Sequence, residues 1–202
     1  MRRDALRLGF GGLLGLGLGG CRQNDAWYGV DVSGTLPELR FTMTRAGDAA
    51  TVDAGTYRGQ IVALFFGYTN CPGICPMTLA NLSAVADALG TDAAGFSILF
   101  VTVDPGRDSL AAMEAYANAF SPRTDALRGS DNQLAALARR YRVTYKLGAH
   151  RPGDTDYKVS HGKTVYLFDA RGAARLLWPD FATAAADIPA AVRDLRRLRQ
   201  TG

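Results

Sequence analysis

Two cysteines separated by three residues form the strongest chemical signal in the chain. Cys71 and Cys75 stand in the run C-P-G-I-C-P at residues 71–76, separated by four residues from the end of a continuous apolar run at residues 61–66. If a helix begins near Cys71, side chains four residues apart project from the same face and can chelate one ion. The positive N-terminus of such a helix would also favour the thiolate, the form that a nucleophile and a metal ligand both require.

The same spacing is compatible with other roles. The pair could form a disulfide staple, which an oxidising compartment permits, or could be two small buried residues. A staple across so short a loop would constrain little entropy in the unfolded chain. The pair could also be a redox couple, in which one cysteine attacks a substrate disulfide and the other resolves the mixed intermediate. Spacing alone leaves staple, redox couple and metal clamp open.

A third ligand for a metal can come from only two histidines. His150 lies in a polar loop at residues 146–156, where we expect a solvated side chain. His161 directly precedes a predicted strand at residues 165–168, which we expect beside the strand that leads to Cys71. Two thiolates and one imidazole suit Cu(I), and with a water or a further donor they also hold Cu(II). A closed structural zinc site would want a fourth protein ligand. The residues alone leave His161 equally open to a capping or packing role.

The elements that must position these residues alternate between strand and helix patterns. Continuous or alternating apolar runs predict strands at residues 39–43, 61–66, 96–103, 165–168 and 174–178. Apolar residues at helical spacing predict helices at residues 75–89, 110–120, 130–141 and 188–198. The run S-D-N-Q at residues 130–133 predicts a capping box at the start of the third helix. This order of elements predicts an α/β fold, a three-layer sandwich with no internal domain boundary.

The first twenty residues differ from the rest of the chain. Three arginines precede an uncharged, glycine-rich apolar run at residues 8–20, which is the pattern of a signal peptide. A spanning helix needs about 20 mostly apolar residues, so we expect no retained transmembrane helix. Small residues stand directly before Cys21, and this resembles the lipobox of bacterial lipoproteins, in which the cysteine is acylated. The alternative is cleavage by ordinary signal peptidase, which would leave Cys21 as a lone thiol.

The chain is therefore predicted to consist of a lipoprotein signal peptide (1–20), a lipidated tether (21–26) and one folded domain (27–202). Its composition, 48% hydrophobic and 21% charged, is that of an ordinary globular protein. The formal net charge is +4, and the only basic stripe is an arginine cluster at residues 193–199. We expect that cluster to be the solvated face and last turn of a helix, and we expect no nucleic-acid partner.

Five stretches of the sequence resemble the Sco/SenC family of thioredoxin-like copper chaperones, which are associated with assembly of the binuclear copper centre of cytochrome c oxidase. They are WYGVDVSG (27–34), FFGYTNCPGICPMTL (65–79), FVTVDPGRD (100–108), YKVSH (157–161) and YLFD (166–169). Together they are highly specific, and the resemblance runs along nearly the whole mature chain. The resemblance implies a thioredoxin-like sandwich with an N-terminal strand extension and a C-terminal hairpin plus helix. It also implies that Cys71, Cys75 and His161 bind copper, as Cu(I) or Cu(II).

The resemblance further implies a metal carrier rather than primarily an enzyme. Together with the lipobox pattern, it predicts a lipoprotein of the bacterial cell envelope that faces the periplasm, is anchored to the membrane through Cys21, and passes copper to the copper-accepting subunit of cytochrome c oxidase. An upstream copper donor or a thiol reductant would be further partners. The main alternative is a thiol-disulfide oxidoreductase acting on a respiratory or periplasmic protein. Against it stand the C-x3-C spacing, where redox thioredoxins have C-x-x-C, and the lack of a proline at residues 161–164.

Two positions depart from the family pattern. The family commonly has an aspartate immediately before the histidine, where this chain has Ser160. A carboxylate there could orient the histidine or tune the charge of the site, so its absence is expected to weaken Cu(II) binding or to mark a divergent subgroup. Residues 44–50 lack the D-x-x-G turn that usually follows the first core strand, and we expect this to alter only a loop.

Overall fold

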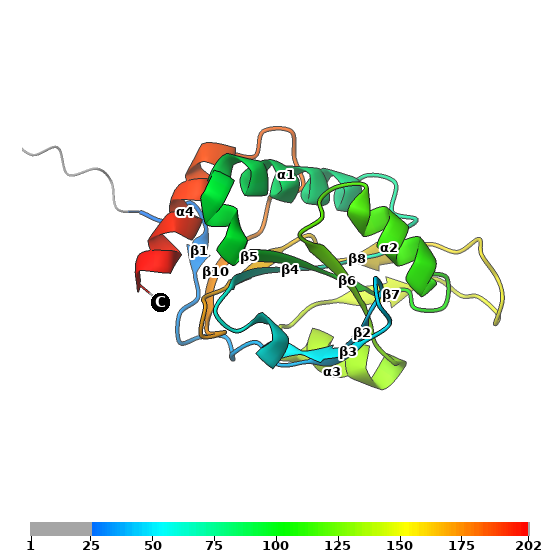
Figure 1. Ribbon diagram of the computed structural model, residues 1–202. Helices are drawn as coiled ribbons and strands as arrows, with labels where there is room; N and C mark the ends of the chain where they lie inside the picture. Colours follow the sequence, from blue (N-terminus) through cyan, green and yellow to red (C-terminus); the bar gives the residue numbers. More distant parts are fainter. Residues whose placement is uncertain (1–25, 202) are drawn as a thin grey trace, which may run out of the picture.

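The computed structural model describes residues 26–201, and these form a central sheet with helices on both faces (Figure 1). The main sheet contains β1 (Val30–Asp31), β2 (Thr42–Arg45), β3 (Thr51–Asp53), β4 (Ile61–Gly67), β5 (Phe96–Thr102), β6 (Thr124–Arg128), β9 (Val165–Phe168) and β10 (Ala174–Trp178). The helices are α1 (Ile74–Leu89), α2 (Leu110–Asn118), α3 (Asp131–Arg140) and α4 (Ile188–Thr201), with short 3-10 turns at Ala54–Tyr57 and Gly90–Gly95. Helices α1 and α4 lie on one face and α3 on the other, which confirms the predicted three-layer sandwich.

The centre of the sheet is made by the apolar runs that predicted buried strands. The strand order is β1-β10-β9-β4-β5-β6-β2-β3. Strands β4 and β5 are parallel, and β9 pairs antiparallel with β4 on its other side. Every residue of β4 is buried, as expected of a strand covered on both faces. The predicted neighbourhood of β9 and the strand leading to Cys71 is therefore confirmed.

The ends of the described chain are fastened together by one buried carboxylate. Asp194 of α4 accepts hydrogen bonds from the backbone N–H groups of Tyr28 (3.0 Å) and Gly29 (2.9 Å) and from Nε1 of Trp178 (3.1 Å). Next to these hydrogen bonds, β1 pairs with β10, and β10 forms a hairpin with β9. The predicted N-terminal strand extension and C-terminal hairpin plus helix are both present.

Local signals located the third helix well. The Ser130 hydroxyl accepts from the backbone N–H of Gln133 at 3.3 Å, and the Gln133 side chain accepts from the Ser130 N–H at 2.8 Å, so the capping box is confirmed. The helix ends at Arg140, and Tyr141 just beyond it is buried and donates its hydroxyl to the Glu38 carbonyl. The helix packs on the face of the sheet opposite α1 (Figure 1).

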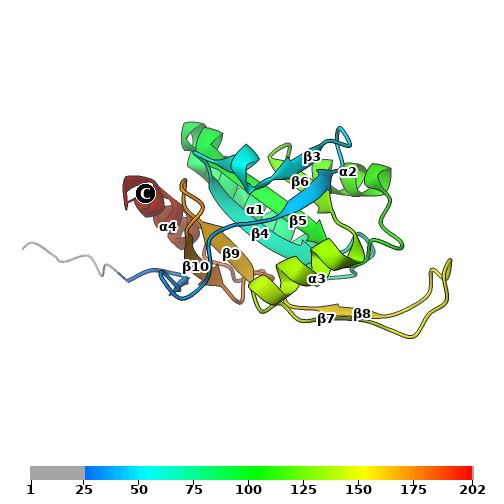
Figure 2. The same cartoon turned by 90° about the horizontal axis from the view of Figure 1, so that it is seen from below.

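The structure also contains strands that the sequence did not predict. They are β3, β6 and a separate two-stranded ribbon of β7 (Tyr145–Leu147) and β8 (Val159–His161). Figure 2 shows the ribbon beside the main sheet, with its connecting loop projecting beyond it. The first core strand begins at Thr42 rather than at residue 39, and the departure at residues 44–50 falls mainly in the β2–β3 turn. The ribbon matters most, because it carries His161.

The predicted signal peptide, Cys21 and the tether up to residue 25 lie outside the described residues. Within residues 26–201, no helix is both long enough and apolar enough to cross a membrane.

Candidate metal centre

Cys71 lies in the loop between β4 and α1, not on the helix itself. The helix begins at Ile74 with Gly73 as its N-cap residue, which agrees with the helix predicted at residues 75–89, whereas the condition that a helix begins near Cys71 is not met. The reason is local, because Pro72 disfavours the helical conformation in the residue before it. The Cys71 sulfur instead accepts a hydrogen bond from the backbone N–H of Cys75 at 3.4 Å, where the first N–H groups of a helix lack helical partners. The two cysteines are brought together by this contact.

Cys75 sits in the first turn of α1 and points into the protein. Its side chain has no exposed surface, whereas Cys71 is 9% exposed. The space for the Cys75 sulfur is provided by Gly67 at the end of β4. A β-carbon at position 67 would lie 2.6 Å from that sulfur and 2.7 Å from the ring of Phe100. A glycine is therefore required at the point where β4 passes beneath the cysteine.

His161 completes the cluster from the end of β8. Its Nε2 atom lies 3.4 Å from the Cys75 sulfur and 3.8 Å from the Cys71 sulfur. The three potential ligand atoms all lie within 4.8 Å of one another, and residues 26–201 contain no other comparable group of three His, Cys, Asp or Glu side chains. The imidazole is half-buried and makes edge contacts with the rings of Phe65 (5.9 Å, 73°) and Tyr68 (5.7 Å, 88°).

The orientation of the His161 ring is set by the backbone. Its Nδ1 lies 2.8 Å from the carbonyl oxygen of Gly162. In the neutral ring this hydrogen bond places the proton on Nδ1 and leaves the Nε2 lone pair facing the sulfurs. Ser160, where the family commonly has aspartate, is exposed and precedes His161 on β8. The orienting group is thus a peptide carbonyl and not the residue before the histidine.

The two thiols influence each other's protonation. The pKa of Cys71 is held well below the usual thiol range, chiefly by a hydrogen bond from the Cys75 thiol and further by the backbone N–H groups of Gly73 and Cys75. The pKa of Cys75 is raised well above that range, because its thiol donates to Cys71 and is buried. In the metal-free protein at neutral pH, Cys71 is the thiolate and Cys75 keeps its proton. A soft cation at this site would displace that remaining proton.

The loop that carries Cys71 rests on a buried carboxylate that sequence reasoning missed. Asp108 is 1% exposed and accepts from the backbone N–H of Thr69 (3.1 Å), from the Thr69 hydroxyl (2.6 Å) and from the Thr102 hydroxyl. Thr69 stands two residues before Cys71. The available signal was the position of Asp108 within the stretch at residues 100–108 that resembles the family.

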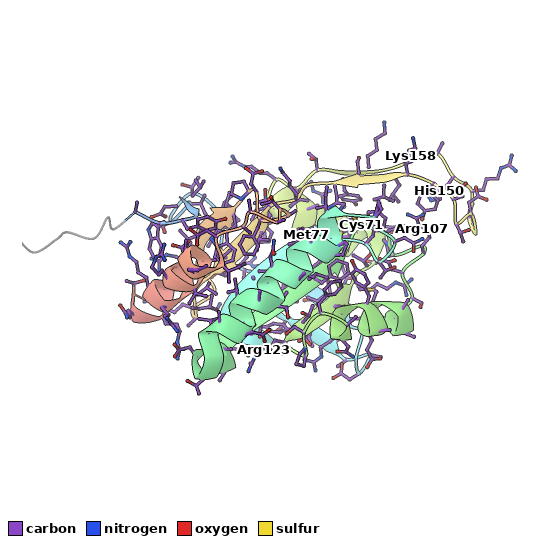
Figure 3. All side chains as sticks on the ribbon, turned by 90° about the horizontal axis from the view of Figure 1, so that it is seen from above. Cys71, Met77, Arg107, Arg123, His150 and Lys158 are labelled. Carbon is purple, nitrogen blue, oxygen red and sulfur yellow. The ribbon has the colours of Figure 1, made fainter. Side chains whose placement is uncertain are left out.

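The surface over the ligands is hollowed and partly apolar. A hollow of about 370 Å³ is lined by Tyr68, Cys71, Pro72, Gly73, Ile74, Val159, Ser160 and His161. Near the start of α1, Ile74 and Met77 are each 38% exposed, and Figure 3 labels Met77 and Cys71 along this part of the molecule. An incoming group could therefore reach Cys71 and His161 from this side, whereas Cys75 lies behind them.

The second histidine stays apart from this cluster. His150 lies in the loop between β7 and β8, is exposed, and stacks on the ring of Tyr157 with centroids 4.0 Å apart and planes 16° apart. It is not a member of the three-residue group. The structure thus brings Cys71, Cys75 and His161 together and leaves His150 out.

Comparison with known proteins gives a consistent set of similarities. The family model described as SCO1/SenC matches residues 37–197. The chain is 36% identical over 176 residues to a curated Bos taurus protein named "Protein SCO2 homolog, mitochondrial", covering 79% of this chain and 64% of that protein. It therefore spans less than two thirds of the length of this relative.

Two solved structures resemble the fold closely. A structure described as Bradyrhizobium japonicum ScoI with copper bound superposes with a TM-score of 0.70 at 31% identity, covering 80% of this chain and 98% of that one. The solution structures of apo Sco1 from Thermus thermophilus give a TM-score of 0.74 at 31% identity, covering 86% of this chain and 97% of that one. The likeness extends over almost the entire length of both structures.

Proposed function

The chain belongs to the SCO1/SenC family, and we propose that it is a copper chaperone that binds one copper ion through Cys71, Cys75 and His161. The observation that carries the proposal is the convergence of two sulfurs and one imidazole nitrogen within 4.8 Å. Such a donor set suits Cu(I) and, with a water or a further donor, Cu(II). The bound copper in the Bradyrhizobium japonicum relative supports the same choice of metal. Copper is the cargo of this protein.

The acceptor in this proposal is the copper-accepting subunit of cytochrome c oxidase, and transfer proceeds by ligand exchange. A thiolate or imidazole of the acceptor displaces His161 first, while the ion stays on the two sulfurs. Burial supports this order, because His161 is half-buried and lines the hollow whereas Cys75 has no exposed surface. An upstream copper donor or a thiol reductant would prepare the site.

The proposal places the protein in the bacterial cell envelope as a lipoprotein anchored through Cys21 and facing the periplasm. The small residues before Cys21 support acylation there. The geometry of the folded part is compatible with this arrangement. The first described residues lie near α4 and β1, at the opposite end of the molecule from the β7–β8 ribbon (Figure 1). A tether at that end would leave the metal site free to meet an acceptor.

Copper titration of the reduced, metal-free full chain in detergent tests the ligand set. We expect one Cu(I) per wild-type chain and loss of tight binding in Cys71→Ser, Cys75→Ser and His161→Ala. Each variant is compared with wild type by circular dichroism, so that loss of binding is separated from loss of fold. If the wild-type chain bound no copper at micromolar concentrations, the carrier function would be wrong.

A second function is favoured by the state of the cysteines. Cys71 has a lowered pKa and some exposure, and Cys75 lies behind it as a protonated thiol, which is the arrangement of an attacking and a resolving cysteine. The protein could thus reduce a disulfide of a respiratory or periplasmic protein while forming a Cys71–Cys75 disulfide. Catalytic turnover of a model disulfide by the metal-free chain, together with failure to bind copper, would select this function.

A further inference from the structure

The histidine and the cysteines are carried by parts of the fold that are not joined by sheet hydrogen bonds. Cys71 and Cys75 are positioned by β4 and α1, within the main body. His161 is carried by the β7–β8 ribbon, which forms its own two-stranded sheet. Tyr145 and Val159 pack the root of the ribbon against the core. The distance between the His161 nitrogen and the sulfurs therefore depends on how the rest of the ribbon is fastened.

Arg107 binds the segment that leads into β8. Its Nη1 donates to the carbonyl oxygens of Thr155 (2.9 Å) and Tyr157 (3.1 Å), and its guanidinium carbon lies 3.8 Å from the centroid of the Tyr157 ring. The cationic face contact and the two hydrogen bonds act on the same short segment. Figure 3 labels Arg107 near Cys71, with His150 on the neighbouring loop.

Asp104 links Arg107 and Tyr157, because its carboxylate bonds to both side chains. Its carboxylate has no exposed surface, accepts from Nε of Arg107 and also accepts from the hydroxyl of Tyr157. Tyr157 is thereby held at its carbonyl, its ring and its hydroxyl. We call these three residues, Asp104, Arg107 and Tyr157, the clasp. A charge-assisted and buried network of this kind restrains its members more strongly than exposed pairs do.

The loop that supplies the clasp also supports the cysteine side. Asp104 and Asp108 belong to the same five-residue segment, and Asp108 bonds to Thr69, two residues before Cys71. Tyr157 stands four residues before His161. One segment after β5 is therefore bonded to the approaches of both halves of the metal centre.

We propose that Arg107 and Asp104 are positioning residues, which hold the β7–β8 ribbon so that Nε2 of His161 meets the two sulfurs. This role rests on the proposed copper site, because it concerns the geometry of its ligands. The clasp acts through His161 and touches neither the metal nor the cysteines. Its removal is expected to weaken copper binding about tenfold, the lower end of the loss usual for groups that orient metal ligands.

The test compares Arg107→Gln and Tyr157→Phe with wild type in the full chain. Arg107→Gln removes the guanidinium with its hydrogen bonds to Thr155 and Tyr157, its ion pair and its contact with the Tyr157 ring. Tyr157→Phe removes only the hydroxyl bond to Asp104 and keeps the ring beneath the guanidinium. We expect about a tenfold loss of Cu(I) affinity in the first and a smaller loss in the second, measured by competition with a chromogenic chelator. Arg151→Gln is the matched control, because Arg151 is exposed on the loop between β7 and β8 and its side chain makes no hydrogen bond or ion pair within residues 26–201. It should bind as wild type does.

A double-mutant cycle separates positioning from a general effect on folding or charge. In the His161→Ala background, Arg107→Gln should cause no further loss, because the residue through which it acts is gone. An equal loss in both backgrounds, or an unchanged affinity of Arg107→Gln, would overturn the proposal. Tyr157→Phe keeps the cycle usable if Arg107→Gln fails to fold.

A readout without metal distinguishes failure of this inference from failure of the proposed function. In the metal-free chain, nuclear Overhauser contacts between the rings of His161 and Phe65 should be strong in wild type and reduced in Arg107→Gln. Contacts that persist in Arg107→Gln would refute the positioning role, whatever the copper result. Absence of copper binding by wild type would count against the proposed function alone.

Discussion

Gly67 leaves room for the side chain of Cys75, since a β-carbon at position 67 would lie 2.6 Å from the Cys75 sulfur. Gly67→Ala should therefore push Cys75 out of place, or be accommodated only by strain in β4. We expect the free energy of unfolding to fall by roughly 1–3 kcal/mol, the usual cost of overpacking, and copper affinity to fall with it. Urea unfolding and copper titration of the same preparation measure both effects.

The control for this prediction is Gly95→Ala. An added β-carbon at Gly95 meets no atom within 4 Å, and its backbone does not adopt the left-handed conformation. Its copper affinity should equal that of wild type. Normal copper binding by Gly67→Ala would show that the contact between residue 67 and the sulfur does not constrain the site.

Alkylation of the metal-free chain should depend on pH in an unusual way. Because the pKa of Cys71 is lowered, its thiolate is already formed in mild acid, and raising the pH adds no more of it. An ordinary thiol, with a pKa of about 8.5, would react roughly tenfold faster for each unit of pH up to that value. Cys75 should remain unreactive, since it is buried and its pKa is raised. Peptide mass spectrometry after iodoacetamide treatment identifies the modified cysteine.

The expected result is a rate for Cys71 that changes little between about pH 5 and pH 8. A rate that climbs tenfold per unit over this interval would contradict the assignment of Cys71 as the thiolate.

Ser160→Asp tests the departure from the family pattern. Ser160 is exposed, and the His161 Nδ1 is already bonded to the Gly162 carbonyl. An added carboxylate should therefore act by its charge and not by reorienting the ring. We expect Cu(II) affinity to rise a few-fold, with a smaller change for Cu(I), because the attraction grows with the charge of the ion. Ser160→Asn is the neutral control, and equal Cu(II) affinities of the two variants would show that charge at this position has no effect.

Asp194→Ala should destabilise the fold without altering the ligand set. The change leaves three buried or partly buried N–H donors, on Tyr28, Gly29 and Trp178, without their acceptor. We expect a loss of roughly 2–5 kcal/mol in the free energy of unfolding. Asp156→Ala, at an exposed loop position, is the matched control. A urea midpoint unchanged from wild type in Asp194→Ala would disprove the role of this carboxylate.

The strands at the centre of the fold could be predicted because their signals are local. The apolar run at residues 61–66 is continuous, and the hairpin of β9 and β10 begins and ends where the sequence places it. Strand β6 could not be recognised in the same way. Its sequence T-D-A-L-R has only two apolar residues, and it becomes a strand because its register with β5 buries them.

The metal centre was predicted in its members but not in its geometry. Soft donors and spacing drew attention to the cysteines, while Pro72 moved the helix start beyond Cys71. The approach of His161 depends on the pairing of β9 with β4, between residues more than 100 positions apart, and on the β7–β8 ribbon, in which Tyr145 pairs with His161. The contact between Arg107 and Tyr157 joins residues 50 positions apart, so no local sequence pattern could predict it.

The hydrogen bonds of Asp194 to Tyr28, Gly29 and Trp178 have a mechanical consequence. A pull on the chain from its N-terminal side would reach the fold at Tyr28 and Gly29 and would pass through Asp194 and the β1–β10 pair into α4. Those contacts lie at the end of the molecule away from β7 and β8 (Figure 1). Force arriving through a tether would thus load α4 and the β9–β10 hairpin first, and not the β7–β8 ribbon that carries His161.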